Sequence, residues 1–180
     1  MSPLPLRCAL SVGLAAAALV AAPIARSAEA TEAAEATETT VQNAAHNKRL
    51  VTDAFNRWAA GGSDFFNEML APDVVWTIAG SSPSAGTYRG REPFIARAVL
   101  PFVSRLRTPV RPSATRIWAD GEHVIIHWSG NAVALDGKPY HNDYVWIFRM
   151  RDDRAVEVHA FLDLVPYEDV LRRIPGKEAA

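Results

Sequence analysis

The sequence predicts an α+β fold in which helices near the N-terminus pack on one face of an antiparallel β-sheet. Helical periodicity dominates residues 46–106, the first half of the expected folded region. β-branched and aromatic residues dominate the second half, where Asp120-Gly121 and Asp136-Gly137 lie between apolar runs as hairpin turns do. Helices followed by a strand meander are typical of α+β domains.

The composition points to one globular domain with appendages. The chain has 180 residues, of which 49% are hydrophobic and 22% charged. Its 19 Lys and Arg residues nearly balance 20 Asp and Glu residues, so no basic excess exists to bind phosphates and we expect no nucleic-acid partner. Cys8 is the single cysteine, which excludes a disulfide framework, cysteine-ligated zinc and thiol catalysis.

Residues 1–30 have the pattern of a secretory signal peptide. Arg7 precedes an apolar run over residues 9–22, and Ala28-Glu29-Ala30 offers a small-residue cleavage site. The run is short for a bilayer span, although an uncleaved N-terminal anchor is the alternative. We expect cleavage after Ala30, a periplasmic or secreted protein, and no membrane attachment after cleavage.

The residues after the signal peptide predict a spacer, a domain and a short tail. Residues 31–45 consist almost wholly of Ala, Glu and Thr and hold one large apolar residue, Val41, so we expect a disordered spacer. The folded domain is expected over residues 46–175, and residues 176–180 form a C-terminal tail.

Apolar periodicity predicts three helices and one strand before the meander. The first helix ends at Gly61-Gly62, and Ser63 can cap a short second helix that stops at Pro72. A strand is expected over residues 73–78. The third helix follows a turn-rich loop and is expected to kink at Pro101. The apolar stripe of the first helix is Leu50, Ala54, Phe55 and Trp58; that of the third is Phe94, Ile95, Val99, Phe102, Val103 and Leu106.

Four strands and a last helix complete the domain. The strands are expected over residues 110–118, 122–134, 140–150 and 155–164, and the helix over 167–174.

The hairpin at Asp136-Gly137 determines which side chains share a face. A two-residue turn there places Leu135 opposite Lys138, and cross-strand partners lie on the same face of a sheet. One face then mixes polar and aromatic side chains, as the wall of a ligand pocket does. Its predicted pairs are His127 with Trp146, Ser129 with Tyr144, and Asn131 with Asn142.

The opposite face is plainer and apolar. Because helices can cover only one face of the sheet, we expect this second face to pack against another subunit in a homodimer. Its predicted residues are Val124, Ile126, Trp128, Val145 and Ile147.

Two registers are open for the last hairpin. A three-residue bulged loop over residues 151–153 turns one set of side chains into the pocket: Val158, Ala160 and Leu162. A two-residue turn at Asp152-Asp153 turns in the other set: His159, Phe161 and Asp163. We favour the bulge because it keeps charged residues out of the core.

Three motifs together carry a resemblance to a known family. They are DVVWTIAG at 73–80, GTYRGREPF at 86–94 and NDYVWIFRMRDDRAVEVHAFLD at 142–163. Their order and spacing resemble the SnoaL-like branch of the nuclear transport factor 2-like superfamily over residues 46–174. The resemblance implies a cone-shaped, curved sheet with N-terminal helices packed over it (a cystatin-like roll), usually dimeric, with a deep apolar pocket. Members of the superfamily have Gly where this chain has Asp153, which tolerates a positive φ.

The superfamily includes ketosteroid isomerases, polyketide cyclases, limonene epoxide hydrolase and scytalone dehydratase, and two of its residue sets are missing here. The isomerase base, oxyanion tyrosine and second acid fall near Ile78, near Phe55 or Asn56, and at Trp146. The Asp–Arg–Asp set of the epoxide hydrolases falls near His127, Ser129 and Ala160. The resemblance therefore implies a fold and a pocket without assigning a reaction.

His127 and Tyr144 are the candidate catalytic residues. A neutral imidazole at position 127 could take a proton from an apolar substrate, although a core histidine satisfied by a hydroxyl is the alternative. Tyr144 could donate a hydrogen bond to a developing oxyanion. The candidate ligand-binding residues are Trp76, Tyr88, Arg116, Ser129, Asn142 and Trp146.

The sequence predicts neither a metal nor a cofactor. His123 and His127 lie on a strand, where four residues separate two side chains by about 13 Å, too far to share one ion. No nucleotide-binding or nucleophile-elbow motif occurs.

Three functions remain open from the sequence. The first is a cofactor-independent isomerase, cyclase or dehydratase that moves a proton on a small apolar molecule. The second is a binding protein with the same pocket and no chemistry, and the third is a dimeric accessory module with a vestigial pocket.

Overall fold

The structure, a computed structural model, describes residues 22–176. The chain divides into two compact units, Met1–Thr37 and Glu38–Ala180. Most of the segment expected to be a signal peptide, residues 1–21, lies outside the described residues, as do residues 177–180 of the expected tail. None of the helices within residues 22–176 combines the length and the hydropathy that a membrane span requires.

Helix α1 is much longer than the sequence indicated. It runs over Ala22–Ala59 and includes residues 31–45, for which the composition predicted a disordered spacer. Ala and Glu are strong helix formers, and side-chain bonds at i,i+4 spacing support the backbone here. Gln42 Nε2 donates to Glu38 Oε1 at 3.2 Å, and Thr37 Oγ1 donates to the Ala33 carbonyl at 2.7 Å. Residues 31–45 are therefore helical because of the helix propensity of Ala and Glu and these local bonds, without a stripe of apolar residues.

Four further helices and a π-helical turn follow. They are α2 Phe65–Met69, α3 Arg91–Phe94, η1 Ile95–Val99, α4 Leu100–Val103 and α5 Leu164–Arg173. The kink expected at Pro101 is a π-helical turn directly before it. Because Pro101 has no N–H, the carbonyl of Arg97 has no donor four residues ahead, and this favours the wider turn. Asp163 caps α5 by accepting a bond from the Val165 N–H.

Six strands form one sheet in the order β2-β1-β6-β5-β4-β3. Their bounds are β1 Leu70–Ile78, β2 Gly86–Arg89, β3 Leu106–Asp120, β4 His123–Ala134, β5 Pro139–Arg151 and β6 Arg154–Leu162. All neighbours are antiparallel except β1 and β6, which pair in parallel. The four long meander strands were predicted within a few residues, whereas the short β2 in the turn-rich loop was not.

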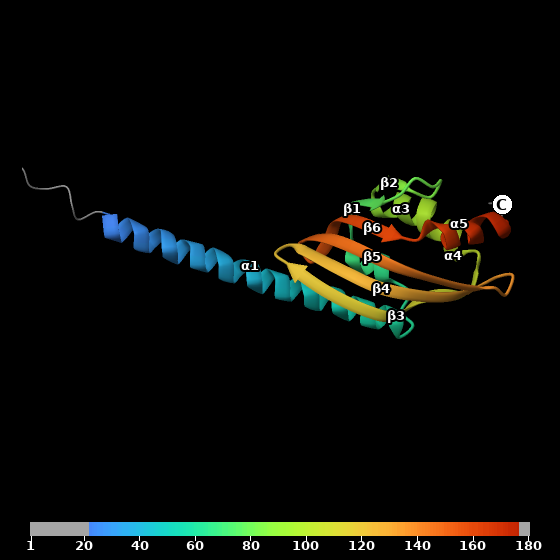
Figure 1. Cartoon of the computed structure of the whole chain (residues 1–180), viewed down its shortest axis with the longest axis horizontal. Helices are drawn as coiled ribbons and strands as arrows, with labels where there is room; N and C mark the ends of the chain where they lie inside the picture. The colour runs from blue at the N-terminus through green and yellow to red at the C-terminus, as the bar shows by residue number, and fades with distance from the viewer. Residues whose placement is uncertain (1–21, 177–180) are drawn as a thin grey trace, which may run out of the picture. The chain divides into compact units, whose positions relative to one another are not determined.

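Helices cover one face of this curved sheet (Figure 1). Phe55 of α1 contacts Trp128 and Trp146, and Phe102 of α4 contacts Tyr140. This inner face is buried, with residues such as Val124, Ile126, Phe148 and Val158 at 0% exposure. The predicted α+β architecture is confirmed.

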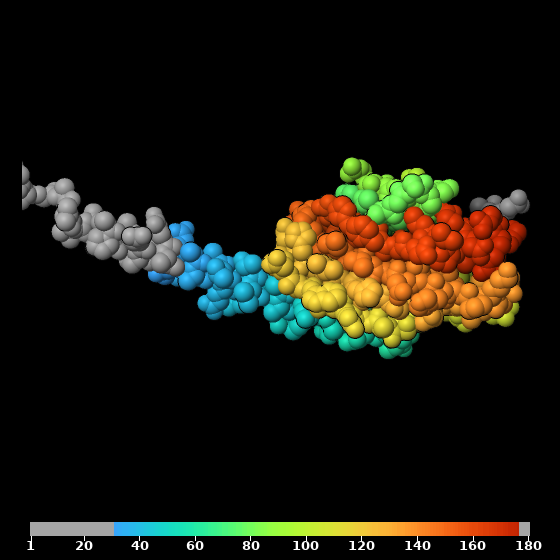
Figure 2. Space-filling model, viewed as in Figure 1, coloured from blue at the N-terminus to red at the C-terminus, as the bar shows by residue number. Residues whose placement is uncertain are grey.

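The opposite, outer face of the sheet carries no helix over β4, β5 and β6 in the space-filling view (Figure 2). The sequence predicted Val124, Ile126 and Trp128 for this face, and that prediction is wrong because all three lie in the core. Val145 and Ile147 do lie on the outer face, where they pair with His127 and Ile125.

Candidate functional site

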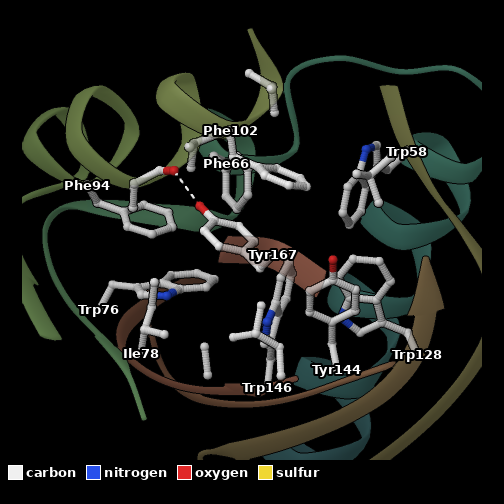
Figure 3. A pocket seen from close by; sticks show the side chains of 16 residues that line it. Trp58, Phe66, Trp76, Ile78, Phe94, Phe102, Trp128, Tyr144, Trp146 and Tyr167 are labelled. Atoms are coloured by element: carbon white, nitrogen blue, oxygen red, sulfur yellow. Dashed lines mark hydrogen bonds between the residues drawn. The ribbon is translucent and has the colours of Figure 1, made fainter. Parts of the chain in front are cut away.

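A cavity of about 110 Å³ lies between the inner face of the sheet and the helices, and carbon atoms form almost all of its wall (Figure 3). Aromatic side chains dominate the wall. Four are tryptophans, namely Trp58, Trp76, Trp128 and Trp146. Phe66, Phe94, Phe102, Tyr144 and Tyr167 add five more rings.

The rings hold one another in place. Trp128 and Tyr144 stack with centroids 3.9 Å apart, and Trp76 stacks on Phe94 at 4.2 Å. Trp146 stands edge-on to both stacks, 4.8 Å from Trp128 and 5.1 Å from Trp76. Stacked and edge-to-face pairs are the favoured geometries of aromatic rings, so the wall is rigid and preformed.

Gly130 leaves the room that the Trp128–Tyr144 stack needs. A Cβ at this position would lie 2.8 Å from Trp128 Cζ3 and 3.2 Å from Tyr144 Cε2. It would also lie 2.8 Å from Val110 Cγ1. Any side chain at residue 130 would therefore collide with Trp128 and Val110 and force them, and the stacked Tyr144, to shift.

The ionisable side chains that line the cavity are tyrosines, and they stay neutral near pH 7. Burial raises the pKa of Tyr140, which lies beside the cavity, to about 12. Burial likewise raises the pKa values of Tyr144 and Tyr167 well above 10. Among the residues that line the cavity, all of them within the described part of the chain, none carries a carboxylate, an imidazole or an amine. The lining thus offers neutral hydroxyl and indole donors but no base that works near pH 7.

These buried phenols predict loss of stability in alkali. The unfolded chain ionises a tyrosine near pH 10, whereas the folded chain keeps Tyr140, Tyr144 and Tyr167 protonated to higher pH. Their contribution is therefore complete below pH 10 and is lost as the pH rises from 10 toward the folded-state values. Each tyrosine should lower the free energy of unfolding by about 1.4 kcal/mol per pH unit in that window.

Denaturant unfolding followed from about pH 8 to about pH 11 measures this slope. In the Tyr140→Phe variant the free energy of unfolding should fall less steeply above pH 10, by the contribution of one tyrosine, about 1.4 kcal/mol per pH unit. A slope that does not change in this variant would contradict the assignment.

The polar residues predicted for the cavity lie elsewhere because the hairpin turn is longer than expected. Its loop has three residues, Leu135, Asp136 and Gly137, with the Gly137 N–H bonded to the Ala134 carbonyl and Gly137 at a φ of 87°. This is a type I turn followed by a glycine bulge. The extra residue moves every pairing by one, and a shift by one turns each side chain of β4 to the other face.

His127 lies on the outer face and is exposed. It pairs with Val145 on β5 and with Arg116 on β3, and Arg116 is exposed too. Ser129 pairs with Asp143 on the same outer face, and its hydroxyl donates to the Asp143 carboxylate. The predictions that His127 is a catalytic base in the cavity, and that Arg116 and Ser129 line it, are therefore wrong.

Asn142 and Tyr88 are close to the cavity but do not line it. Asn142 is 3% exposed, and its amide bonds to Tyr140 and to the backbone of Asp163. Tyr88 lies on β2, where its ring contacts Phe94 and its hydroxyl donates to the Ser84 carbonyl at 3.4 Å. Neither side chain is among the residues that line the cavity, where the sequence predicted both.

The structure brings three predicted residues, Trp76, Tyr144 and Trp146, together in the cavity wall. The sequence missed the other rings. Trp58 was on the predicted helix stripe, so a helix covering the sheet could have placed it over the cavity. Trp128 was assigned to the wrong face, and the glycine at the third position of a possible three-residue loop was the available signal.

The last hairpin combines the two registers that were open. Asp152 and Asp153 form a two-residue turn with φ values of 50° and 62°, and Arg151 pairs with Arg154. A register shift between Arg149 and Met150 follows, and it restores the inward set that we favoured. That set is Val158, Ala160 and Leu162, of which the last two line the cavity.

No group of three or more His, Cys, Asp or Glu side chains within the described residues could hold a metal ion.

Comparison with known proteins identifies the family. The model of the SnoaL-like domain matches residues 51–158, more than half of the chain. A search of curated proteins found no match.

Three solved structures of about 20% identity share the fold. Bal32a from a soil-derived mobile gene cassette has 18% identity and a TM-score of 0.60, with 72% of this chain and 99% of that chain covered. TerC, co-crystallized with polyporic acid, has 21% identity and a TM-score of 0.55, with 70% and 98% covered. A putative SnoaL-like polyketide cyclase from Jannaschia sp. CCS1 has 19% identity and a TM-score of 0.54, with 74% and 96% covered.

At these identities the solved structures establish the fold alone. The family match and the shared fold agree, and the chain belongs to the SnoaL-like family.

Proposed function

We propose that this protein binds a small, flat, largely apolar molecule in the cavity and does not act on it by acid–base proton transfer. The aromatic wall with no carboxylate, imidazole or amine carries the proposal. A preformed apolar cavity loses little conformational entropy when it takes up a ligand. The nearest polar groups, the tyrosine hydroxyls, cannot accept a substrate proton near pH 7 because their pKa values are raised.

TerC was co-crystallized with polyporic acid. That observation belongs to TerC, but it supports the idea that this fold can receive aromatic molecules.

Calorimetric titration with single-ring hydrocarbons, ethylbenzene as the probe, tests the proposal. A cavity of about 110 Å³ is of the order that accepts one benzene-sized molecule. We expect saturable binding with one site per chain and a negative heat-capacity change, since apolar surface is buried. No saturable heat at any temperature would contradict the proposal.

The outer face supports a second proposal, a homodimer. Trp118, Ile125 and Phe161 are 49%, 37% and 46% exposed there, and Val145 and Ile147 are half-buried beside them. Trp118, Ile125 and Ile147 form a continuous row across three strands. A contiguous apolar patch of this kind marks an interaction surface, and a second copy of the same sheet would cover it.

The Phe161→Asp variant places a charge in this apolar patch, and we therefore expect it to sediment as a monomer where the wild-type protein sediments as a dimer. The matched control is Val165→Asp on α5, which changes an apolar residue of 77% exposure away from this face and should leave the dimer intact. A wild-type protein that sediments as a monomer would overturn the proposal.

We also propose that the protein is exported and cleaved after Ala30. The positive start, the apolar run and the Ala28-Glu29-Ala30 site support this. The mass of the protein recovered from a periplasmic fraction should correspond to residues 31–180. Recovery of the full-length mass from the cytoplasm alone would contradict it.

A further inference from the structure

A chain of polar side chains leads from the end of β6 to the cavity wall, and it begins at Asn142. The Asp163 N–H donates to Asn142 Oδ1 at 3.1 Å, and Asn142 Nδ2 donates to the Asp163 carbonyl at 2.7 Å. These two bonds fix the orientation of the amide, because a flipped amide would place donor against donor and acceptor against acceptor. Asn142 Nδ2 therefore points its second proton at the Tyr140 hydroxyl, 2.9 Å away.

The direction of the next bond follows from counting protons. Tyr140 Oη lies 2.7 Å from Tyr144 Oη, and either atom could donate. The oxygen of Tyr140 already accepts from Asn142. If it also accepted from Tyr144, its own buried proton would have no partner among the described residues, and an unpaired buried donor is costly. Tyr140 thus donates to Tyr144.

The hydroxyl proton of Tyr144 is then left for the cavity. Tyr144 lines the cavity (Figure 3). Tyr140 and Asn142 are not among the residues that line it. The other hydroxyl in the wall, that of Tyr167, donates to the Ala98 carbonyl at 2.9 Å, as the dashed line in Figure 3 marks. A hydrogen bond received from Tyr140 also polarises the Tyr144 O–H and strengthens it as a donor.

The indoles of the wall add donors and no acceptor. The buried N–H groups of Trp76 and Trp128 have no hydrogen-bond partner within the described residues. Trp128 stacks on Tyr144, so its N–H belongs to the same part of the wall. The polar groups at this end of the cavity are thus matched to a ligand that accepts hydrogen bonds and donates none.

We propose that Tyr144 donates a hydrogen bond to a carbonyl oxygen of the ligand, so that the cavity selects aromatic ketones, aldehydes or quinones over hydrocarbons of the same shape. This inference rests on the proposed apolar binding function and names the ligand class of that site. Asn142 and Tyr140 are positioning residues, which act by aiming and polarising the Tyr144 hydroxyl. The raised pKa of Tyr144 supports the role, since the donor stays protonated across the physiological range.

Acetophenone and ethylbenzene are the probes, because they share a ring and a two-carbon side chain and differ in the carbonyl oxygen. The Tyr144→Phe variant should weaken acetophenone relative to ethylbenzene by about five- to tenfold, the usual worth of one hydrogen bond. The infrared carbonyl stretch of bound acetophenone should lie at lower frequency in the wild type than in this variant. Tyr88→Phe makes the same chemical change outside the cavity and should leave both readouts unchanged.

The Tyr140→Phe variant tests the direction of the chain. If Tyr140 donates to Tyr144, its removal leaves Tyr144 donating to the ligand more weakly, and the carbonyl frequency moves part of the way toward the Tyr144→Phe value. If Tyr144 donates to Tyr140, removal of Tyr140 frees the Tyr144 proton, and the carbonyl frequency moves the opposite way. The second result would overturn the inference.

The two failures are distinguishable. If both probes bind, and the ratio of the acetophenone affinity to the ethylbenzene affinity is the same in the wild type and in Tyr144→Phe, the inference is overturned but the apolar binding function stands. Binding of neither probe to the wild type would overturn both.

Discussion

Alanine in place of Trp128 is expected to lower the free energy of unfolding by about 3–5 kcal/mol, the range for a fully buried aromatic residue. Trp128 is 2% exposed and contacts rings from two elements: Phe55 and Trp58 of α1, and Tyr144 and Trp146 of β5. Its loss would leave a large void beside the ligand cavity, where the rigid rings around it can only partly collapse. Equilibrium denaturation in urea gives the value.

Trp118→Ala is the matched control, because it makes the same chemical change on the outer face. Trp118 is 49% exposed in a single chain but belongs to the proposed dimer surface, so both variants are compared in the monomeric Phe161→Asp background. There its truncation should change the free energy of unfolding by no more than about 0.5–1 kcal/mol. Equal losses in the two variants would contradict the assignment of faces in the sheet. His127→Ala, one residue from Trp128, should also have a small effect.

Leucine in place of Ala160 is expected to weaken ligand binding by at least tenfold. Ala160 is 1% exposed, pairs with Trp146 on one side and Ile78 on the other, and lines the cavity. The larger side chain adds three carbon atoms inside the cavity and competes with the ligand for the same volume. The affinity for ethylbenzene, measured by calorimetric titration, reports the change, and denaturation confirms that the variant folds.

Phe161→Leu provides the comparison for this variant. It places leucine at the next residue of β6, on the outer face, and should not alter the affinity for ethylbenzene. Retention of wild-type affinity in Ala160→Leu would mean that the probe binds elsewhere. Loss of affinity in Phe161→Leu would also contradict the proposed site, since its side chain does not reach the cavity.

The architecture was predictable because its signals are local and redundant. Each hairpin carries its own turn residues, and the strands between them are rich in β-branched and aromatic side chains over many positions. An error of one or two residues at a strand end does not change the fold. The long α1 was missed because apolar patterning, used as the signal for a helix, ignores segments in which Ala and Glu propensity is sufficient.

The site was harder to predict because a difference of one residue in the length of a hairpin loop changes which side chains face the cavity. Asp136-Gly137 fits both a two-residue turn and the end of a three-residue loop, and the two readings exchange the inner and outer faces of β4. The shorter reading placed His127 in the cavity and Trp128 outside it; the structure shows the reverse. Residues outside this register, such as Trp76, were unaffected. Chemistry inferred from which face a side chain occupies is therefore only as secure as the loop that sets the register.

The indole N–H signals in a proton–nitrogen correlation spectrum test the central claim most directly. The chain has five tryptophans, of which Trp58, Trp76, Trp128 and Trp146 line the cavity and Trp118 lies on the outer face. Titration with ethylbenzene should move the signals of the four cavity tryptophans together and leave that of Trp118 in place. Movement of the Trp118 signal alone, or of none of the five, would contradict the account.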